Sequence, residues 1–94
     1  MFEIRVLETG AVQLRGRLDA AEADRALEAL NQLPGPLTLD CAELEYISSA
    51  GISVIMQVYG RLSSSGSRLQ LVALTPRVRN VFAYAGLDKL LDIR

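Results

Sequence analysis

The chain has 94 residues, half of them hydrophobic, and its 10 basic residues nearly balance its 11 acidic ones. This length predicts a single domain over residues 1–94 with a hydrophobic core, and the lack of any block of like charge excludes the usual footprint of nucleic-acid binding or of direct membrane binding. With no histidine and only one cysteine, imidazole-assisted nucleophiles, zinc ligand sets and an internal disulfide are also excluded.

The first segments of the chain alternate between apolar and polar residues. Phe2 to Leu7 follows this pattern, which is typical of a half-buried strand, and Ala11 to Leu18 repeats it. The turn sequence at residues 8–10, which ends in glycine, predicts that the two strands form a β-hairpin.

A helix and a buried strand are predicted next. Asp19 is followed three residues later by Glu22, which is the pattern of a capping box at the start of a helix. Apolar residues then recur at helical spacing until the Pro-Gly-Pro sequence at 34–36. The apolar run from Leu37 to Cys41 predicts a buried strand, and Ala42 to Ile47 is expected to be a connecting loop.

The second half of the chain continues to alternate helices and strands. A helix is predicted from Ser48, with an apolar face made by Ile52, Ile55, Met56, Tyr59 and Leu62. A strand over residues 69–74, a helix that begins at Thr75 and Pro76, and a last strand or helical turn over 90–93 follow. The order β-β-α-β-α-β-α-β predicts an α/β fold with a mixed sheet, because the hairpin is antiparallel and the helical crossovers join parallel strands.

The segment Asp40 to Gly51, with sequence DCAELEYISSAG, holds the residues that suggest function. It leads from a strand into the N-terminus of a helix, where unpaired N–H groups and the helix dipole favour an anion. A serine at this place can cap the helix or accept a phosphate that the helix end would tolerate.

Three stretches resemble the STAS domains, and specifically the bacterial anti-sigma factor antagonists. LDCAELEYISSAGISVI is similar to the family signature, GRLDAAEADRAL to its Gly-x-Leu-Asp segment, and TPRVRNVFAYAGLDKLLDI to its C-terminal pattern. The resemblance covers nearly the whole chain. It implies a mixed sheet packed on helices, in a non-enzymatic signalling protein without metal or cofactor.

The resemblance also implies a switch residue. In that family the unphosphorylated antagonist binds an anti-sigma factor that is also a serine kinase, and this binding frees the sigma factor. Phosphorylation of the serine two residues before the signature glycine separates the pair, and a PP2C-like phosphatase reverses it. These positions match Ser49 and Gly51, while the residue before the switch, often an aspartate in the family, is Ser48.

Several neighbours of Ser49 are expected to form its surroundings. The family pattern places Asp19 and Asp40 on loops beside the switch, although each could instead be a helix cap or a strand end. Ser48 and Ala50 flank the switch, and Gly51 either lets a partner approach or packs the helix tightly on the sheet. Two further residues of the same helix either contact the partner or are buried: Val54 and Val58.

Other interpretations belong to different classes of protein. STAS domains also serve as accessory subunits of membrane lipid or anion transport systems, which need no switch serine. An enzyme would need converging carboxylates, for which only Asp19 and Asp40 are candidates. The single cysteine, an N-terminus unlike a signal peptide and the absence of a long apolar run favour a cytoplasmic setting.

Overall fold

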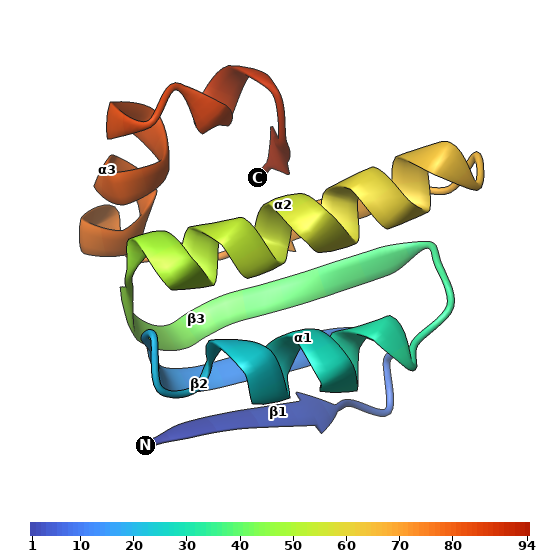
Figure 1. The fold of residues 1–94 in the computed structure, drawn as a ribbon, viewed down its shortest axis with the longest axis horizontal. Coiled ribbons are helices and arrows are strands. Elements are labelled where there is room, and N and C mark those ends of the chain that lie inside the picture. Colours follow the sequence, from blue (N-terminus) through green and yellow to red (C-terminus); the bar gives the residue numbers. More distant parts are fainter.

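The computed structural model describes residues 1–94 as a five-stranded sheet covered by helices (Figure 1). The strands lie in the order β1-β2-β3-β4-β5. They comprise β1 (Phe2–Val6), β2 (Val12–Leu18), β3 (Leu37–Ile47), β4 (Leu69–Val72) and β5 (Asp92–Ile93). β1 is antiparallel to β2, and every other neighbouring pair is parallel. The predicted mixed α/β sheet is therefore confirmed.

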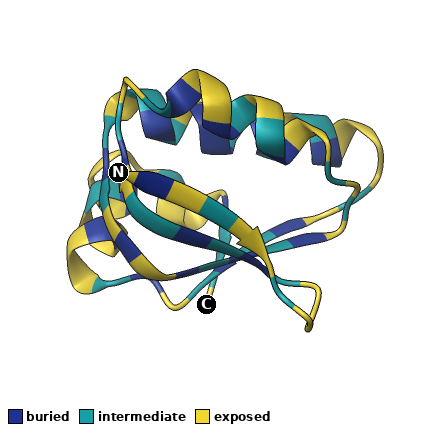
Figure 2. Ribbon diagram, turned by 90° about the horizontal axis from the view of Figure 1, so that it is seen from below, coloured by how far each residue is buried: buried dark blue, intermediate teal, exposed yellow.

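The helices occupy two places on this sheet. α1 (Ala23–Asn31) and α2 (Ser49–Ser64) lie side by side across one face (Figure 1), and their buried residues face the strands (Figure 2). α3 (Pro76–Tyr84) contacts β3 near the start of α2 and is followed by a short 3₁₀ turn, Leu87–Lys89. The longest helix, α2, has 16 residues, and no helix combines the length and apolar character that crossing a membrane requires.

β3 is longer than the sequence pattern indicated. The segment 42–47 was expected to be a loop, but it continues the strand and pairs with β2 as far as Leu18 and Ile47. Two register shifts interrupt this pairing, and Ala42 and Glu43 are both exposed between the buried residues Cys41 and Leu44. Such bulges break the two-residue alternation that identifies a strand, which is why the sequence pattern missed this half of β3.

The core is a single cluster of 22 buried residues between the sheet and the helices. From α2 this cluster includes Val54, Ile55, Val58 and Leu62, and Gly51 on the same side of the helix is also buried. Two residues of the predicted face, Ile55 and Leu62, are fully buried. The other three are partly buried and pack against the cluster: Ile52, Met56 and Tyr59. Apolar residues surround much of α2, so their spacing alone could not identify the side that faces the sheet.

Val54 and Val58 need a related correction. They are 2% and 0% exposed, because they lie on the side of α2 that faces the core. The expectation that they belong to a partner-contact surface is therefore wrong, and burial is the interpretation that holds.

Candidate functional site at the start of α2

The loop between β3 and α2 is fastened to the end of β2 by Ser48. Its backbone N–H donates to the carbonyl oxygen of Leu18 at 3.0 Å. Ser48 is also the N-cap of α2, since its Oγ accepts a hydrogen bond from the N–H of Gly51 at 3.2 Å and donates to the Leu18 oxygen at 3.4 Å. The Ser48 hydroxyl is thus used both as acceptor and as donor within the fold.

Ser49 differs from Ser48 in both exposure and bonding. It is the first residue of α2, its side chain is exposed, and its hydroxyl makes no hydrogen bond within the chain. The first N–H groups of a helix lack intrahelical acceptors and lie at the positive end of its dipole. An exposed hydroxyl therefore stands where added negative charge would be tolerated by the helix.

Gly51 has a packing role. A Cβ atom at this position would lie 2.6 Å from the carbonyl oxygen of Leu18 and 2.7 Å from Cγ1 of Ile47. Only glycine lets the first turn of α2 rest this closely on the ends of β2 and β3. Because Gly51 is buried, the expectation that it admits a partner backbone is wrong, and the tight-packing interpretation holds.

Asp19 lies at the same end of the sheet as the two serines. It follows Leu18 directly, and its Oδ1 accepts a hydrogen bond from the N–H of Glu22 at 3.2 Å. This bond lies in the turn before α1, whose N-cap is Glu22 without a side-chain cap bond, so the predicted capping box is wrong. The Glu22 carboxylate instead pairs with Arg25 at 2.6 Å.

Asp40 lies elsewhere, which corrects its expected place beside the switch. It pairs with Gln13 of β2, whereas the connection from β3 to α2 that holds the two serines follows the pair of Leu18 and Ile47. We call this connection the switch loop. The five residue steps from Gln13 to Leu18 span about 16 Å at roughly 3.3 Å per residue. Asp40 instead accepts a hydrogen bond from the N–H of Ala42 at 3.0 Å, so it shapes the bulge of β3.

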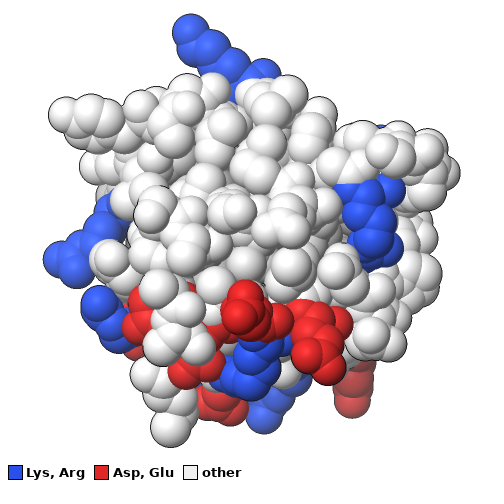
Figure 3. Space-filling view, in the orientation of Figure 1, with Lys and Arg blue, Asp and Glu red and all other residues white.

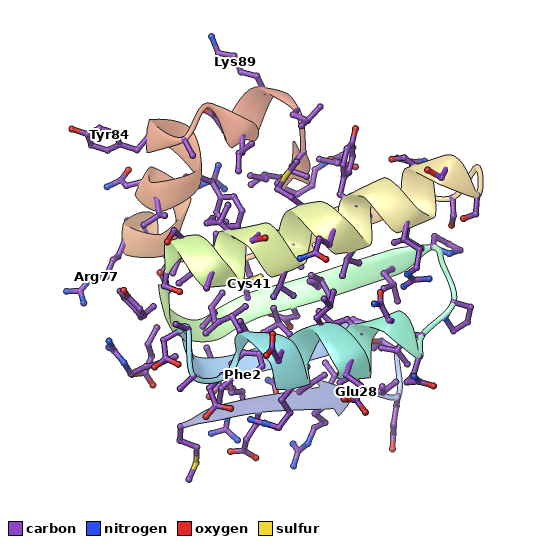
Figure 4. All side chains as sticks on the ribbon, in the orientation of Figure 1. Phe2, Glu28, Cys41, Arg77, Tyr84 and Lys89 are labelled. Atoms are coloured by element: carbon purple, nitrogen blue, oxygen red, sulfur yellow. The ribbon has the colours of Figure 1, made fainter.

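Two arginines near this end of the sheet were not identified from the sequence. Arg17 pairs with Tyr46 immediately before the switch loop, and its Cζ lies 4.2 Å from the centre of the tyrosine ring. Arg77, in the first turn of α3, points outward at the same end (Figure 4). Tyr46 had been assigned to a loop, so its pairing with Arg17 could not be foreseen.

Neither Cys41 nor the largest hollow of the molecule has the arrangement of a catalytic centre. Cys41 is buried, and this burial, together with the charge of Asp40, raises the pKa of its thiol to about 12. The largest hollow lies on the sheet face opposite the helices, where its charged side chains include the ion pair of Arg15 with Glu43 at 3.4 Å. It contains no nucleophile, and no group of His, Cys, Asp and Glu side chains is placed to hold a metal ion.

Comparisons with known proteins agree with one another. The sequence model of the family described as "Mlab, STAS domain" matches residues 3–92. The chain is 28% identical to the anti-sigma-B factor antagonist of Listeria monocytogenes over 99 aligned residues, which cover 99% of this chain and 87% of that protein.

Two solved structures are similar to this fold. One is an anti-sigma factor antagonist of Thermotoga maritima, with a TM-score of 0.80, 25% identity and coverage of 99% and 85%. The other is the Bacillus cell fate determinant SpoIIAA in its phosphorylated form, which shares the fold with a TM-score of 0.70, 18% identity and coverage of 100% and 91%.

Proposed function

The chain belongs to the STAS-domain family, and from this premise we propose that it is an anti-sigma factor antagonist controlled at Ser49. The relatives that carry this function are regulatory proteins, not enzymes, and the similarity spans almost the whole chain. The partner is an anti-sigma factor, whose capture by this protein releases the sigma factor.

The observation that carries the choice of switch is the difference between two adjacent serines. The Ser48 hydroxyl makes two hydrogen bonds: it accepts one from the N–H of Gly51 as the cap of α2 and donates one to the carbonyl oxygen of Leu18. The Ser49 hydroxyl is exposed and unbonded. A kinase can reach Ser49 without opening the helix, whereas modification of Ser48 would first break the cap.

Electrostatics explains how a phosphate at Ser49 would act. It adds about −1.5 to −2 charges at neutral pH. The helix N-terminus tolerates this charge, so the fold survives the modification. A partner surface packed over Ser49 would instead have to bury a charge without a counterion, and the carboxylate of Asp19 at the same end adds to the unfavourable field.

The proposal includes the rest of the cycle. The anti-sigma factor is itself the serine kinase, so it modifies the protein that sequesters it, and a PP2C-like phosphatase restores the free hydroxyl. The protein works in the cytoplasm, where sigma factors meet RNA polymerase. A structural relative of the same fold is known in a phosphorylated form, which supports reversible modification on this scaffold.

A second candidate is an accessory subunit of a membrane lipid or anion transport system. One observation favours it, because the description of the matching family names Mlab and makes no mention of sigma factors. Against it stand the antagonist relatives and the unbonded hydroxyl of Ser49, for which such a subunit has no need.

The two candidates are separated by the partner that the protein retains. Bait treated with phosphatase and bait phosphorylated in the cell are compared in a pull-down, and the retained proteins are identified by mass spectrometry. We expect the dephosphorylated bait alone to retain an anti-sigma factor, which then phosphorylates the wild-type chain in the presence of ATP but not Ser49→Ala. Retention of a transporter ATPase, with no phosphate incorporated, would replace this function with the second candidate.

A further inference from the structure

The size of a specific contact implies that the partner covers more than the start of α2. A stable interface buries about 800 Å² on each partner, which corresponds to a patch roughly 16 Å in radius. If the contact includes Ser49, it must therefore extend well beyond the first turn of the helix. The character of the surface around Ser49 shows in which direction it can extend.

Toward the end of the sheet the surface is charged. Arg17, Asp19 and Arg77 lie there, and covering them would require a partner with matched charges. Along α2 the surface has no such groups. The only charged residue of the helix is Arg61, whose Nη2 donates to the carbonyl oxygens of Leu30 and Leu33 at 3.1 and 2.9 Å. Figure 3 shows this face with the acidic atoms gathered near α1 and β1, with basic atoms there and also at the top, left and right, and with the middle of the face free of charge.

A stripe of half-buried apolar side chains runs along this uncharged area. It consists of Ile52, Met56 and Tyr59, which recur on one side of α2. The fold itself is anchored by the other side of the helix, so this stripe is only partly used by the core. Met56 is seven residues, or about two turns, from Ser49 and therefore faces the same way.

The length of the stripe is close to the radius of such a patch, which is about half of its width. Ten residues separate Ser49 from Tyr59, which is about 15 Å at roughly 1.5 Å per residue. The exposed residues on the other flank of Ser49, Ser53 and Gln57, are uncharged. A surface depleted of charge and containing methionine and tyrosine has the composition of the central part of a protein–protein interface.

We propose that the anti-sigma factor binds along α2 from Ser49 to Tyr59, with the stripe of Ile52, Met56 and Tyr59 as its apolar anchor. The complementary surface of the partner is apolar and uncharged. The contact extends from the switch toward the middle of the helix and not across the charged end of the sheet. This inference rests on the proposed function, because the partner is the one controlled at Ser49.

The test measures binding of the anti-sigma factor recovered by the wild-type bait, purified separately, by titration calorimetry. We expect Met56→Lys and Gln57→Lys each to weaken binding at least about tenfold, since each places a charge inside an apolar contact. Gln32→Lys is the matched control, because Gln32 is an exposed glutamine at the C-terminal end of α1 and not on α2. It should bind as the wild type does. Because Gln57 is exposed, its substitution should leave the fold intact, and a loss of binding then reports on the contact. Urea denaturation checks that the Met56→Lys variant is folded.

Oxidative footprinting supplies a second readout on the unmodified protein. Complex formation should protect Met56 and Tyr59 from oxidation and leave Met1, which is 88% exposed, as reactive as before. If the complex forms and responds to Ser49→Asp, but both lysine variants bind normally and Met56 stays reactive, the inference is wrong and the proposed function stands.

Two further outcomes would also overturn the inference. If the wild type self-associates in sedimentation experiments and Met56→Lys abolishes this association, the stripe is a contact between copies of the chain. If the wild-type bait retains no anti-sigma factor at all, the proposed function fails and the inference falls with it.

Discussion

Two adjacent serines with the same chemistry have different roles because the fold uses only one of them. Ser48 lies at the junction of β3 and α2, where its hydroxyl serves both the helix cap and the end of β2. Ser49 is the next residue and the first of the helix, and its side chain is exposed to solvent. The sequence alone allowed either serine to be the cap, and the bonding pattern separates them.

The two serines should therefore respond differently to substitution. Ser49→Ala should bind the anti-sigma factor and resist phosphorylation, because a small neutral side chain preserves the surface. Ser49→Asp should lose on the order of 100-fold in affinity, since its charge is buried in the contact, yet it should remain folded because acidic residues suit a helix N-terminus. Calorimetry measures both affinities.

Ser48→Ala is the complementary variant. It should still accept phosphate from the kinase and should lose about 1 kcal/mol of unfolding free energy, the usual cost of removing a serine cap. If this variant accepts no phosphate while Ser49→Ala does, the switch has been assigned to the wrong residue.

Two glycines of α2 provide a matched pair for the packing argument. Gly51→Ala should destabilise the protein by about 1–3 kcal/mol, because the new methyl group meets a backbone oxygen of β2 that cannot move aside. Gly60→Ala meets no atom within 4 Å and should stabilise it by about 0.5–1 kcal/mol, since alanine favours a helix. Urea denaturation measures both changes, and equal effects of either sign would refute the close approach at Gly51.

At the scale of elements, the sequence predicted the number, type and order of helices and strands, because hydrophobic periodicity and caps are local signals. It missed the second half of β3, where bulges cancel the alternation, and it did not identify which residues of α2 are buried most deeply. Both errors affected the site. The extra length of β3 carries the switch loop away from Asp40, and the true orientation of α2 buries Val54 and Val58. These features depend on strand register and helix rotation, which tertiary packing decides.

Arg61 fixes α2 against α1 and allows a test of this packing. Its guanidinium donates to the carbonyl oxygens of Leu30, near the end of α1, and of Leu33, just beyond it, and through Nε to Oδ1 of Asn31 at 3.1 Å. Arg61→Met keeps most of the aliphatic stem but leaves these acceptors without their donor, so we expect a loss of about 1–3 kcal/mol in unfolding free energy.

Arg61→Lys should recover little of this loss, because a single ammonium group cannot reproduce the fork of the guanidinium. Arg79→Met, at an exposed position of α3, is the control and should change stability by less than about 0.5 kcal/mol. A neutral effect of Arg61→Met in urea denaturation would mean that the contact between the two helices does not depend on these hydrogen bonds.

The whole molecule separates its two faces by charge. The uncovered face of the sheet carries charged side chains, among them the ion pair of Arg15 and Glu43, and this polarity suits a sheet face that is open to water. The face over α2 is nearly uncharged and begins at the switch serine. One phosphate can therefore change the character of a whole surface, because it introduces charge where there was little before.

The same distribution of titratable groups predicts how stability depends on pH. The chain has no histidine, so no side chain with an ordinary pKa titrates near neutrality, and unfolding free energy should be nearly constant between about pH 5.5 and 7.

In acid, Asp92 should contribute to a decline in the unfolding free energy. Hydrogen bonding from Arg94, helped by Arg68 and Gln70, lowers the pKa of this carboxyl below its usual value. A group with a lowered folded-state pKa stabilises the fold above its unfolded pKa of about 3.9, and that contribution disappears as the pH falls through the folded value. Asp92→Asn should therefore reduce the acid dependence of the urea midpoint without altering its flat region near neutrality. An unchanged acid slope in this variant would show that the contacts around Asp92 in β5 do not persist in solution.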